Sequence, residues 1–242
     1  MDTNRNQARR VVIGITAHVD AGKTTLAEAM LYRTGRLRKL GRVDHGSAAM
    51  DSHLLERERG ITIFSSQAEL PIGNLEVTLL DTPGHVDFSA EMERTLSVLD
   101  YAILVISGAD GVQAHTRTLW RLLELYRIPT FLFVTKMDFG RCGRGQMMEH
   151  LRHELGEGCV DFTPADRERR MEQLATCRED ALEAYLDGGE VPDALVRQLV
   201  GRRLVFPCWF GSGLKLEGID GFLEGLARYV EPPVYPETFS AR

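Results

Sequence analysis

The stretch that decides the fold is Val11-Val12-Ile13-Gly14-Ile15-Thr16-Ala17-His18-Val19-Asp20-Ala21-Gly22-Lys23-Thr24-Thr25. The β-branched run at its start predicts a buried strand, and residues 24–33 have a helix-forming composition. A glycine-containing turn joins the two, and this order of strand, loop and helix is typical of a phosphate-binding loop. Such a loop directs successive backbone N–H groups at one point, where an anion can accept them. The alternative, a chance glycine turn before a helix, is disfavoured by the strand in front of it.

Each residue type in this loop has a chemical reason to be there. Gly22 lets the backbone approach a phosphate closely, and Lys23 supplies a positive charge to the β- and γ-phosphates. The Thr24 hydroxyl is a hard ligand suited to Mg²⁺. The simple pattern has a glycine where Ala17 stands. The predicted phosphate-contacting set is Ala17, His18, Val19, Asp20, Ala21, Gly22, Lys23, Thr24 and Thr25.

A second motif, Asp81-Thr82-Pro83-Gly84-His85, follows an apolar run at residues 75–80. A carboxylate at the end of a strand can hold Mg²⁺ through a water molecule, and the Gly84 N–H can meet a γ-phosphate. His85 would then lie beside the attacking water. Taken alone, a Pro-Gly turn after a strand is common, and a single histidine lies more often on the surface than in a catalytic site.

Two later segments predict a site for a purine base. Thr135-Lys136-Met137-Asp138 follows a strand at residues 131–134, and the Asp138 carboxylate can accept both N–H groups on one edge of guanine. Adenine offers neither group, so the site would discriminate against it. The aliphatic stem of Lys136 can cover the base plane. Gly211-Ser212-Gly213 follows a strand at residues 204–208; its amides can meet the guanine carbonyl, although alone it is an ordinary turn.

A fifth segment, at residues 54–63, contains a candidate second ligand for Mg²⁺. Thr62 would bind the metal from a loop that is ordered by the γ-phosphate. Without the other motifs, the preferred interpretation would be the polar end of a helix followed by a strand.

The alternation of elements predicts an α/β fold with a mostly parallel sheet, flanked by helices, whose site lies at the carboxyl ends of the strands. The expected strands are residues 11–15, 75–80, 101–107, 131–134 and 204–208, and the expected helices are 24–33, 91–99, 114–126 and 221–229. Residues 143–203 break this alternation with three charged helical stretches, at 146–155, 165–186 and 193–203. They predict a helical insertion whose charged faces meet solvent or a partner.

Composition limits the remaining classes. The 242 residues carry 29 basic and 35 acidic side chains, a net charge of −6, which argues against general binding to nucleic acid or membranes. The four cysteines form no Cys-x-x-Cys pair, which argues against a zinc ribbon and is typical of reduced thiols in the cytoplasm. The amino terminus lacks the apolar stretch of a signal peptide, and the run at residues 102–106 is too short to span a membrane.

In chain order, residues 17–25, 57–63, 81–88, 135–138 and 211–213 resemble the five G motifs of translational GTPases of the elongation factor G class. Within that class the sequence is most similar to the tetracycline ribosomal protection proteins, on residues 41–44, 54–63 and 96–117. The resemblance implies a P-loop NTPase G domain over residues 9–235, with the insertion at about 143–203. It also implies that residues 236–242 open a second, β-barrel domain of a longer protein.

The resemblance further implies a GTPase that converts GTP and water to GDP and phosphate under stimulation by the ribosome, with GTP or GDP and Mg²⁺ as cofactors. The implied catalytic residues are His85, Lys23, Thr62 and Gly84, and the implied metal ligands are Thr24, Thr62 and Asp81. Asp20 would help to bind the β–γ region, while Val19 and Ile61 would form an apolar gate in front of His85. We expect a cytoplasmic domain, monomeric in isolation, that meets the ribosome through the full-length protein and binds neither membranes nor free DNA.

Two positions depart from the family pattern. Thr135 stands where the family usually has Asn, which removes an amide that braces the base and the phosphate loop. Gly213 stands where the family usually has Ala; we expect a small effect, with added loop flexibility. Two alternatives stay open: an ordinary elongation factor G translocase or paralogue, and a switch module that binds nucleotide without hydrolysing it. A P-loop kinase or ATPase is disfavoured by Asp138.

Overall fold

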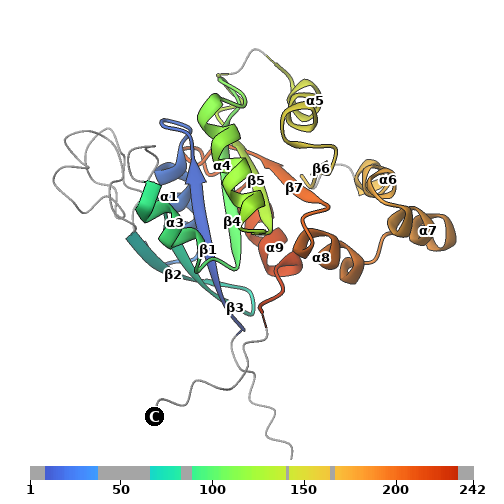
Figure 1. The fold of residues 1–242 in the computed structure, drawn as a ribbon, viewed down its shortest axis with the longest axis horizontal. Helices are drawn as coiled ribbons and strands as arrows, with labels where there is room; N and C mark the ends of the chain where they lie inside the picture. The colour runs from blue at the N-terminus through green and yellow to red at the C-terminus, as the bar shows by residue number, and fades with distance from the viewer. Residues whose placement is uncertain (1–8, 38–65, 83–88, 140–141, 164–166, 234–242) are drawn as a thin grey trace, which may run out of the picture.

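The computed structural model describes residues 9–37, 66–82, 89–139, 142–163 and 167–233 (Figure 1). Within these ranges a seven-stranded sheet has the order β2-β3-β1-β4-β5-β7-β6. The strands are β1 (Arg9–Ala17), β2 (Ser66–Ile72), β3 (Leu75–Asp81), β4 (Tyr101–Ser107), β5 (Thr130–Thr135), β6 (Cys159–Asp161) and β7 (Phe206–Phe210). β2 is antiparallel to β3 and every other pair is parallel, which confirms the predicted α/β fold with a mostly parallel sheet.

Helices pack on both faces of the sheet (Figure 1). They are α1 (Lys23–Arg33), α3 (Ser89–Leu96), α4 (Ala114–Leu125), α5 (Arg144–Leu155), α6 (Arg167–Cys177), α7 (Glu179–Gly188), α8 (Asp193–Gly201) and α9 (Ile219–Tyr229). Alternate side chains of a strand belong to opposite cores, because successive residues point to opposite faces. In β5, Phe131 and Phe133 pack in the core that contains α1 and α9, whereas Leu132 and Val134 pack in the core that contains α4 and α5.

The parallel arrangement places the motif loops at one edge. β1 runs beside β3 in a register that pairs Ile15 with Asp81, and β4 runs beside β5 in a register that pairs Ser107 with Thr135. The carboxyl ends of β1, β3, β5 and β7 therefore lie on the same side of the sheet, where an open α/β sheet places its ligand site.

The structure differs from the sequence-based expectation at the two outermost strands of the sheet, β2 and β6. β2 was not predicted as a paired strand, because its sequence Ser-Gln-Ala-Glu-Leu-Pro-Ile lacks clean alternation and includes Pro71, which is tolerated only where the ladder needs no donor. β6 lies inside the region predicted to be a helical insertion and pairs with β7 in parallel. The single helix expected over residues 165–186 is divided into α6 and α7 at Arg178. Across the described ranges, no helix combines the length and the apolar character that a membrane span requires.

Candidate nucleotide-binding site

The loop between β1 and α1 has the backbone shape of an anion site. Asp20 and Gly22 both have positive φ, at 59° and 92°, and the Ala21 N–H donates to the His18 carbonyl at 3.1 Å. α1 begins at Lys23, and Gly22 at its N-cap has no side chain to occupy the first amides of the helix. Those amides point outward without an intrahelical acceptor, which is the arrangement that binds phosphate at a helix start.

A buried ion pair connects this loop to the end of β3. The Lys23 Nζ lies 2.7 Å from Asp81 Oδ1, and the two side chains are 9% and 0% exposed. Lys23 also donates to the Thr82 carbonyl, and the Thr82 hydroxyl donates to the Ile15 carbonyl at 2.9 Å. Asp81 and Thr82 are thereby fixed against both β1 and the start of α1. A buried charge pair is stable only when opposite charge and hydrogen bonds compensate both partners. The carboxyl ends of the strands therefore carry groups that stabilise buried charge.

The Thr135-Lys136 segment braces the loop from the other side. The Thr135 hydroxyl lies 2.6 Å from the Ala21 carbonyl oxygen and 3.2 Å from that of Ile106, and the side chain is 3% exposed. The Lys136 Nζ donates to the Asp20 carbonyl at 2.6 Å. Lys136 itself has φ of 54°, a left-handed conformation that costs a lysine about 1 kcal/mol or more. Thr135 therefore keeps a brace on the phosphate loop, although the usual Asn amide is absent.

The loop after β7 approaches the start of α1 very closely. A Cβ built on Gly213 would lie 2.9 Å from the Thr25 carbonyl oxygen and 3.2 Å from the Leu26 nitrogen, both backbone atoms. An Ala at this position would thus require the loop or the start of α1 to shift by a few tenths of an ångström. The small effect expected for Gly213 in place of the usual Ala stays a prediction.

The amides of this loop are not equivalent. The Gly211 N–H donates to the Val134 carbonyl and the Ser212 N–H donates to the Glu217 carbonyl, each at 3.0 Å. Within the described residues no backbone acceptor is recorded for the Gly213 N–H. Of the three amides predicted to face a guanine carbonyl, that of Gly213 is the one left for it.

The Asp138 carboxylate, which the sequence predicts to bind the base, is held by Lys215, a residue that the motifs did not include. Asp138 Oδ2 lies 2.6 Å from the Lys215 Nζ, with side chains 29% and 49% exposed. The hydrogen bond from Lys215 lowers the pKa of Asp138, and the same bond raises the pKa of Lys215. The available signal was a lysine two positions after Gly213, which becomes informative only when the loops are seen together.

Some of the predicted site residues are brought together by the structure, and the others lie outside the described ranges. The described ones gather at the carboxyl edge of the sheet: residues 17–25, Asp81, Thr135, Lys136, Asp138, Gly211, Ser212 and Gly213. In this group the His18 ring also faces the His115 ring of α4, with centroids 5.9 Å apart. Ile61, Thr62, Gly84 and His85 lie outside the described residues, as do segments 41–44, 54–63 and 236–242.

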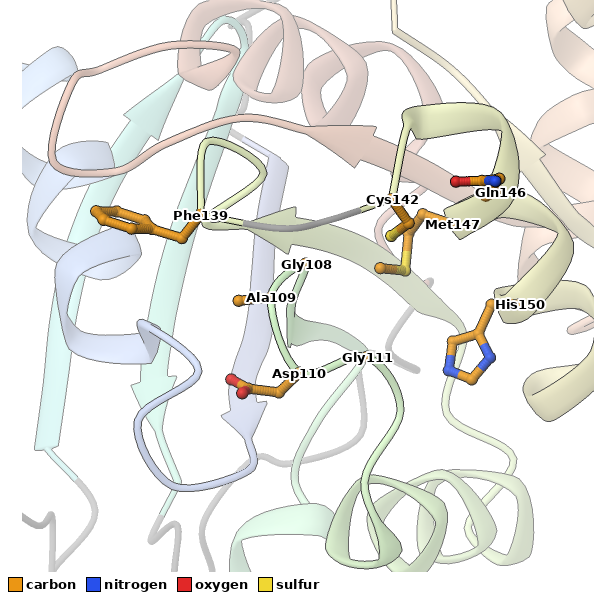
Figure 2. Close-up of a pocket in the computed structure, with 9 residues that line it drawn as sticks. All are labelled: Gly108, Ala109, Asp110, Gly111, Phe139, Cys142, Gln146, Met147 and His150. Atoms are coloured by element: carbon orange, nitrogen blue, oxygen red, sulfur yellow. The ribbon is translucent and has the colours of Figure 1, made fainter.

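A hollow of about 470 Å³ lies beside residues 135–138, the segment predicted to bind the base (Figure 2). Its walls are the loop at residues 108–111, Phe139 and Cys142 after β5, and the first turns of α5. Figure 2 shows the Phe139 ring directed away from Cys142 and Met147, so these three side chains do not converge on one point of the hollow. His150 of α5 accepts a hydrogen bond from the Val112 N–H at 3.1 Å. The insertion is therefore attached directly to loops beside the candidate site.

Comparison with known proteins agrees with this geometry. Residues 8–232 match the family described as the elongation factor Tu GTP binding domain. The chain belongs to this family. A structural comparison finds a crystal structure of a protein from Thermus thermophilus with a TM-score of 0.82 and 28% identity, covering 93% of this chain and 41% of that one.

Curated relatives of this GTP-binding domain fall into two groups. The oxytetracycline resistance protein of Streptomyces rimosus is 41% identical over 249 residues, covering 92% of the chain and 37% of the relative. The tetracycline resistance protein TetM from transposon Tn916 of Enterococcus faecalis is 38% identical over 230 residues, covering 88% and 36%. Elongation factor G of Rhodopseudomonas palustris is 34% identical over 270 residues, covering 91% and 39%. The chain is a translational GTPase domain related to both groups, and it spans less than two fifths of the length of each of these relatives.

Proposed function

We propose that this chain binds GTP and hydrolyses it to GDP and phosphate, as the GTPase domain of a ribosome-associated translation factor of the tetracycline ribosomal protection type. The observation that carries the proposal is the set of contacts that joins the described motif residues: the buried Lys23–Asp81 ion pair, the hydrogen bonds from Thr135 and Lys136 to residues 20–21, and the close approach of Gly213 to α1. The higher identity to the tetracycline resistance proteins than to elongation factor G supports the finer assignment.

Nucleotide binding would use three kinds of group. The amides at the start of α1 and the Lys23 ammonium would hold the phosphates, and the Asp138 carboxylate would accept the two guanine N–H groups. The Gly213 amide would meet the guanine carbonyl. On binding, Lys23 would exchange part of its contact with Asp81 for phosphate oxygens, which leaves that carboxylate to face a metal ion.

The donors present suit Mg²⁺. Asp81 supplies a carboxylate and Thr24 a hydroxyl at the same edge of the sheet, and both are hard oxygen ligands. Thr62 is the third proposed ligand, from its sequence position. Mg²⁺ held by these residues would neutralise charge on the β- and γ-phosphates.

Hydrolysis would follow in-line attack of water oxygen on the γ-phosphorus, with cleavage of the bond to the β–γ bridging oxygen. His85 would orient the water, Lys23 and the Gly84 amide would stabilise charge on the γ-phosphate, and Val19 with Ile61 would restrict His85 until the ribosome is engaged. Thr62 and Gly84 would also order their loops while γ-phosphate is present and release them afterwards. The roles of His85, Gly84, Thr62 and Ile61 rest on the sequence motifs.

The decisive experiment measures ribosome-stimulated GTP hydrolysis by the longer protein carrying this domain, with and without tetracycline. The variant His85→Ala should lose stimulated turnover by about 10²-fold or more and keep its GTP affinity. Turnover that survives in this variant overturns the role of His85. Hydrolysis without protection from tetracycline in cells would favour a translocase or paralogue, and GTP binding without stimulated hydrolysis would favour a switch module.

The remaining organisation belongs to the same proposal. The G domain would comprise residues 9–235 with its insertion at about 143–203, and residues 236–242 would begin a β-barrel domain. The domain would act in the cytoplasm, as a monomer when isolated, and would meet the ribosome as part of the longer protein without binding membranes or free DNA.

A further inference from the structure

The Lys215–Asp138 ion pair connects the two loops that would enclose the guanine base. Asp138 follows β5, and Lys215 lies in the turn between β7 and α9. That turn is closed by reciprocal backbone hydrogen bonds between Ser212 and Glu217, each of 3.0 Å. The Lys215 N–H also lies 3.3 Å from the Ser212 hydroxyl oxygen. The backbone that carries Lys215 is thus fixed at both ends, so its side chain reaches Asp138 from a defined position.

The orientation of an aspartate carboxylate is otherwise weakly determined. Rotation about its last side-chain bond is broad and roughly two-fold, so a partner is needed to fix the orientation of the carboxylate plane. Asp138 interacts with its own backbone N–H and with Lys215. Recognition of guanine requires the two oxygens to face two parallel N–H groups, and this makes the plane of the carboxylate important.

The contact leaves room for a base. An ionised carboxylate has about four lone-pair positions on two oxygens, and guanine would use two of them. Lys215 reaches Oδ2 at 2.6 Å and occupies one position. Lys215 is therefore compatible with bound guanine as a support, and it need not leave for the base to enter.

We propose that Lys215 is a positioning residue that determines guanine specificity by holding the Asp138 carboxylate in the plane required by the two N–H groups of the base. This inference rests on the proposed binding of guanine nucleotide. Its consequence is selective: loss of Lys215 should harm a base that presents two N–H groups more than one that presents a single N–H group.

The test compares GDP with inosine diphosphate, whose base lacks the exocyclic amine. Equilibrium affinities of the full chain are measured for both nucleotides in the unaltered protein and in Lys215→Met and Lys215→Arg. For Lys215→Met we expect GDP affinity to fall about fivefold and inosine diphosphate affinity to change by less than about twofold. Lys215→Arg retains the positive charge and should keep the GDP affinity within about twofold.

A matched control separates positioning from general loss of a surface ion pair. Arg228 and Asp193 form a pair of 2.5 Å with side chains 53% and 33% exposed, close to the values for Lys215 and Asp138, but on α9 and α8. Arg228→Met should change neither affinity. A parallel fall in both affinities for Lys215→Met, unchanged GDP affinity, or tighter GDP binding would each overturn the inference. Failure of the unaltered chain to bind GDP would instead overturn the proposed function.

Discussion

The motif loops and the insertion use the same ion-pair chemistry at different depths. At the loops, Lys23 and Asp81 are 9% and 0% exposed. In the insertion, Arg144 pairs with Asp161 at 37% and 12% exposure, and Arg167 pairs with Glu190 at 61% and 59%. If one partner of the Lys23–Asp81 pair were removed, water could not solvate the remaining charge. If one partner of an insertion pair were removed, water could solvate it. The Lys23–Asp81 contact is therefore required electrostatically, whereas the ion pairs of the insertion lie nearer the surface and each can lose a partner at lower cost.

Arg203, at the end of the insertion and just before β7, packs the insertion against the rest of the domain. Arg203 donates to the Thr130 hydroxyl at 2.8 Å, and its guanidinium lies 4.9 Å from the Trp120 ring centroid and 5.1 Å from that of Phe206. Burial lowers the pKa of Arg203 to about 10. The Arg203 guanidinium is thus largely removed from water and is stabilised by the Trp120 and Phe206 rings and by the Ile128 carbonyl.

The largest effect is expected for Lys23→Met, which leaves the Asp81 carboxylate buried without its cation. The free energy of unfolding should fall by about 3–5 kcal/mol, and GDP binding should be lost. Denaturant unfolding and nucleotide titration measure the two quantities. In the double variant Lys23→Met with Asp81→Asn, stability should recover in part while binding stays absent. A loss below about 1 kcal/mol in the single variant would show that this pair is not electrostatically isolated.

Thr135→Val tests the brace on the phosphate loop at nearly constant volume. The Ala21 carbonyl would lose its hydroxyl donor, which should cost about 1–2 kcal/mol and weaken GDP binding, because the loop is no longer held in its binding shape. Thr130→Val is the control at the opposite end of β5, where the hydroxyl donates to the Ile128 carbonyl at 2.9 Å and accepts from Arg203 at 2.8 Å. It should reduce stability at least as much and leave GDP affinity intact. Equal loss of affinity in both variants would contradict a local brace.

Arg144→Met applies the Lys23 substitution to the insertion. Asp161 stays partly exposed and also accepts the Thr163 N–H at 3.0 Å, so the unfolding free energy should fall by less than about 1 kcal/mol. GDP affinity should not change. A loss as large as that of Lys23→Met, measured by the same denaturant titration, would remove the distinction between the two regions.

The smallest effect is a pH dependence at the contact between α4 and α5. The hydrogen bond from Arg117 to Glu154, 2.6 Å long, holds the pKa of Glu154 below its ordinary value of 4.5. The stabilisation is present above that ordinary value and is lost as pH falls through the lower folded-state pKa. Urea midpoints measured below pH 4.5 should therefore decline less steeply in Glu154→Gln than in the unaltered protein. Identical slopes would show that this carboxylate does not contribute.

The sequence predicted the strand and the helix on either side of residues 17–22 correctly, because their pattern is local. A strand, Gly22, Lys23 and a helix are consecutive, so the phosphate loop follows from short-range order. The same reasoning failed for β6, because three residues are too few to show a period and its partner β7 lies beyond three helices. Lys215 was missed for a similar reason, since its importance depends on contact with a loop on a different strand.

The sequence by itself determined the order of the motifs, the alternating α/β core and the residue types able to bind phosphate, guanine and Mg²⁺. The tertiary structure alone decided that Lys23 reaches Asp81 in a buried pair, that the Thr135 hydroxyl supports Ala21, and that Gly213 lies close to the backbone of α1. The physical reason is the separation along the chain over which each effect acts. Backbone conformation and hydrophobic pattern are set by near neighbours in the chain, whereas burial, and with it the strength of every charge interaction, depends on which distant segments close over a group.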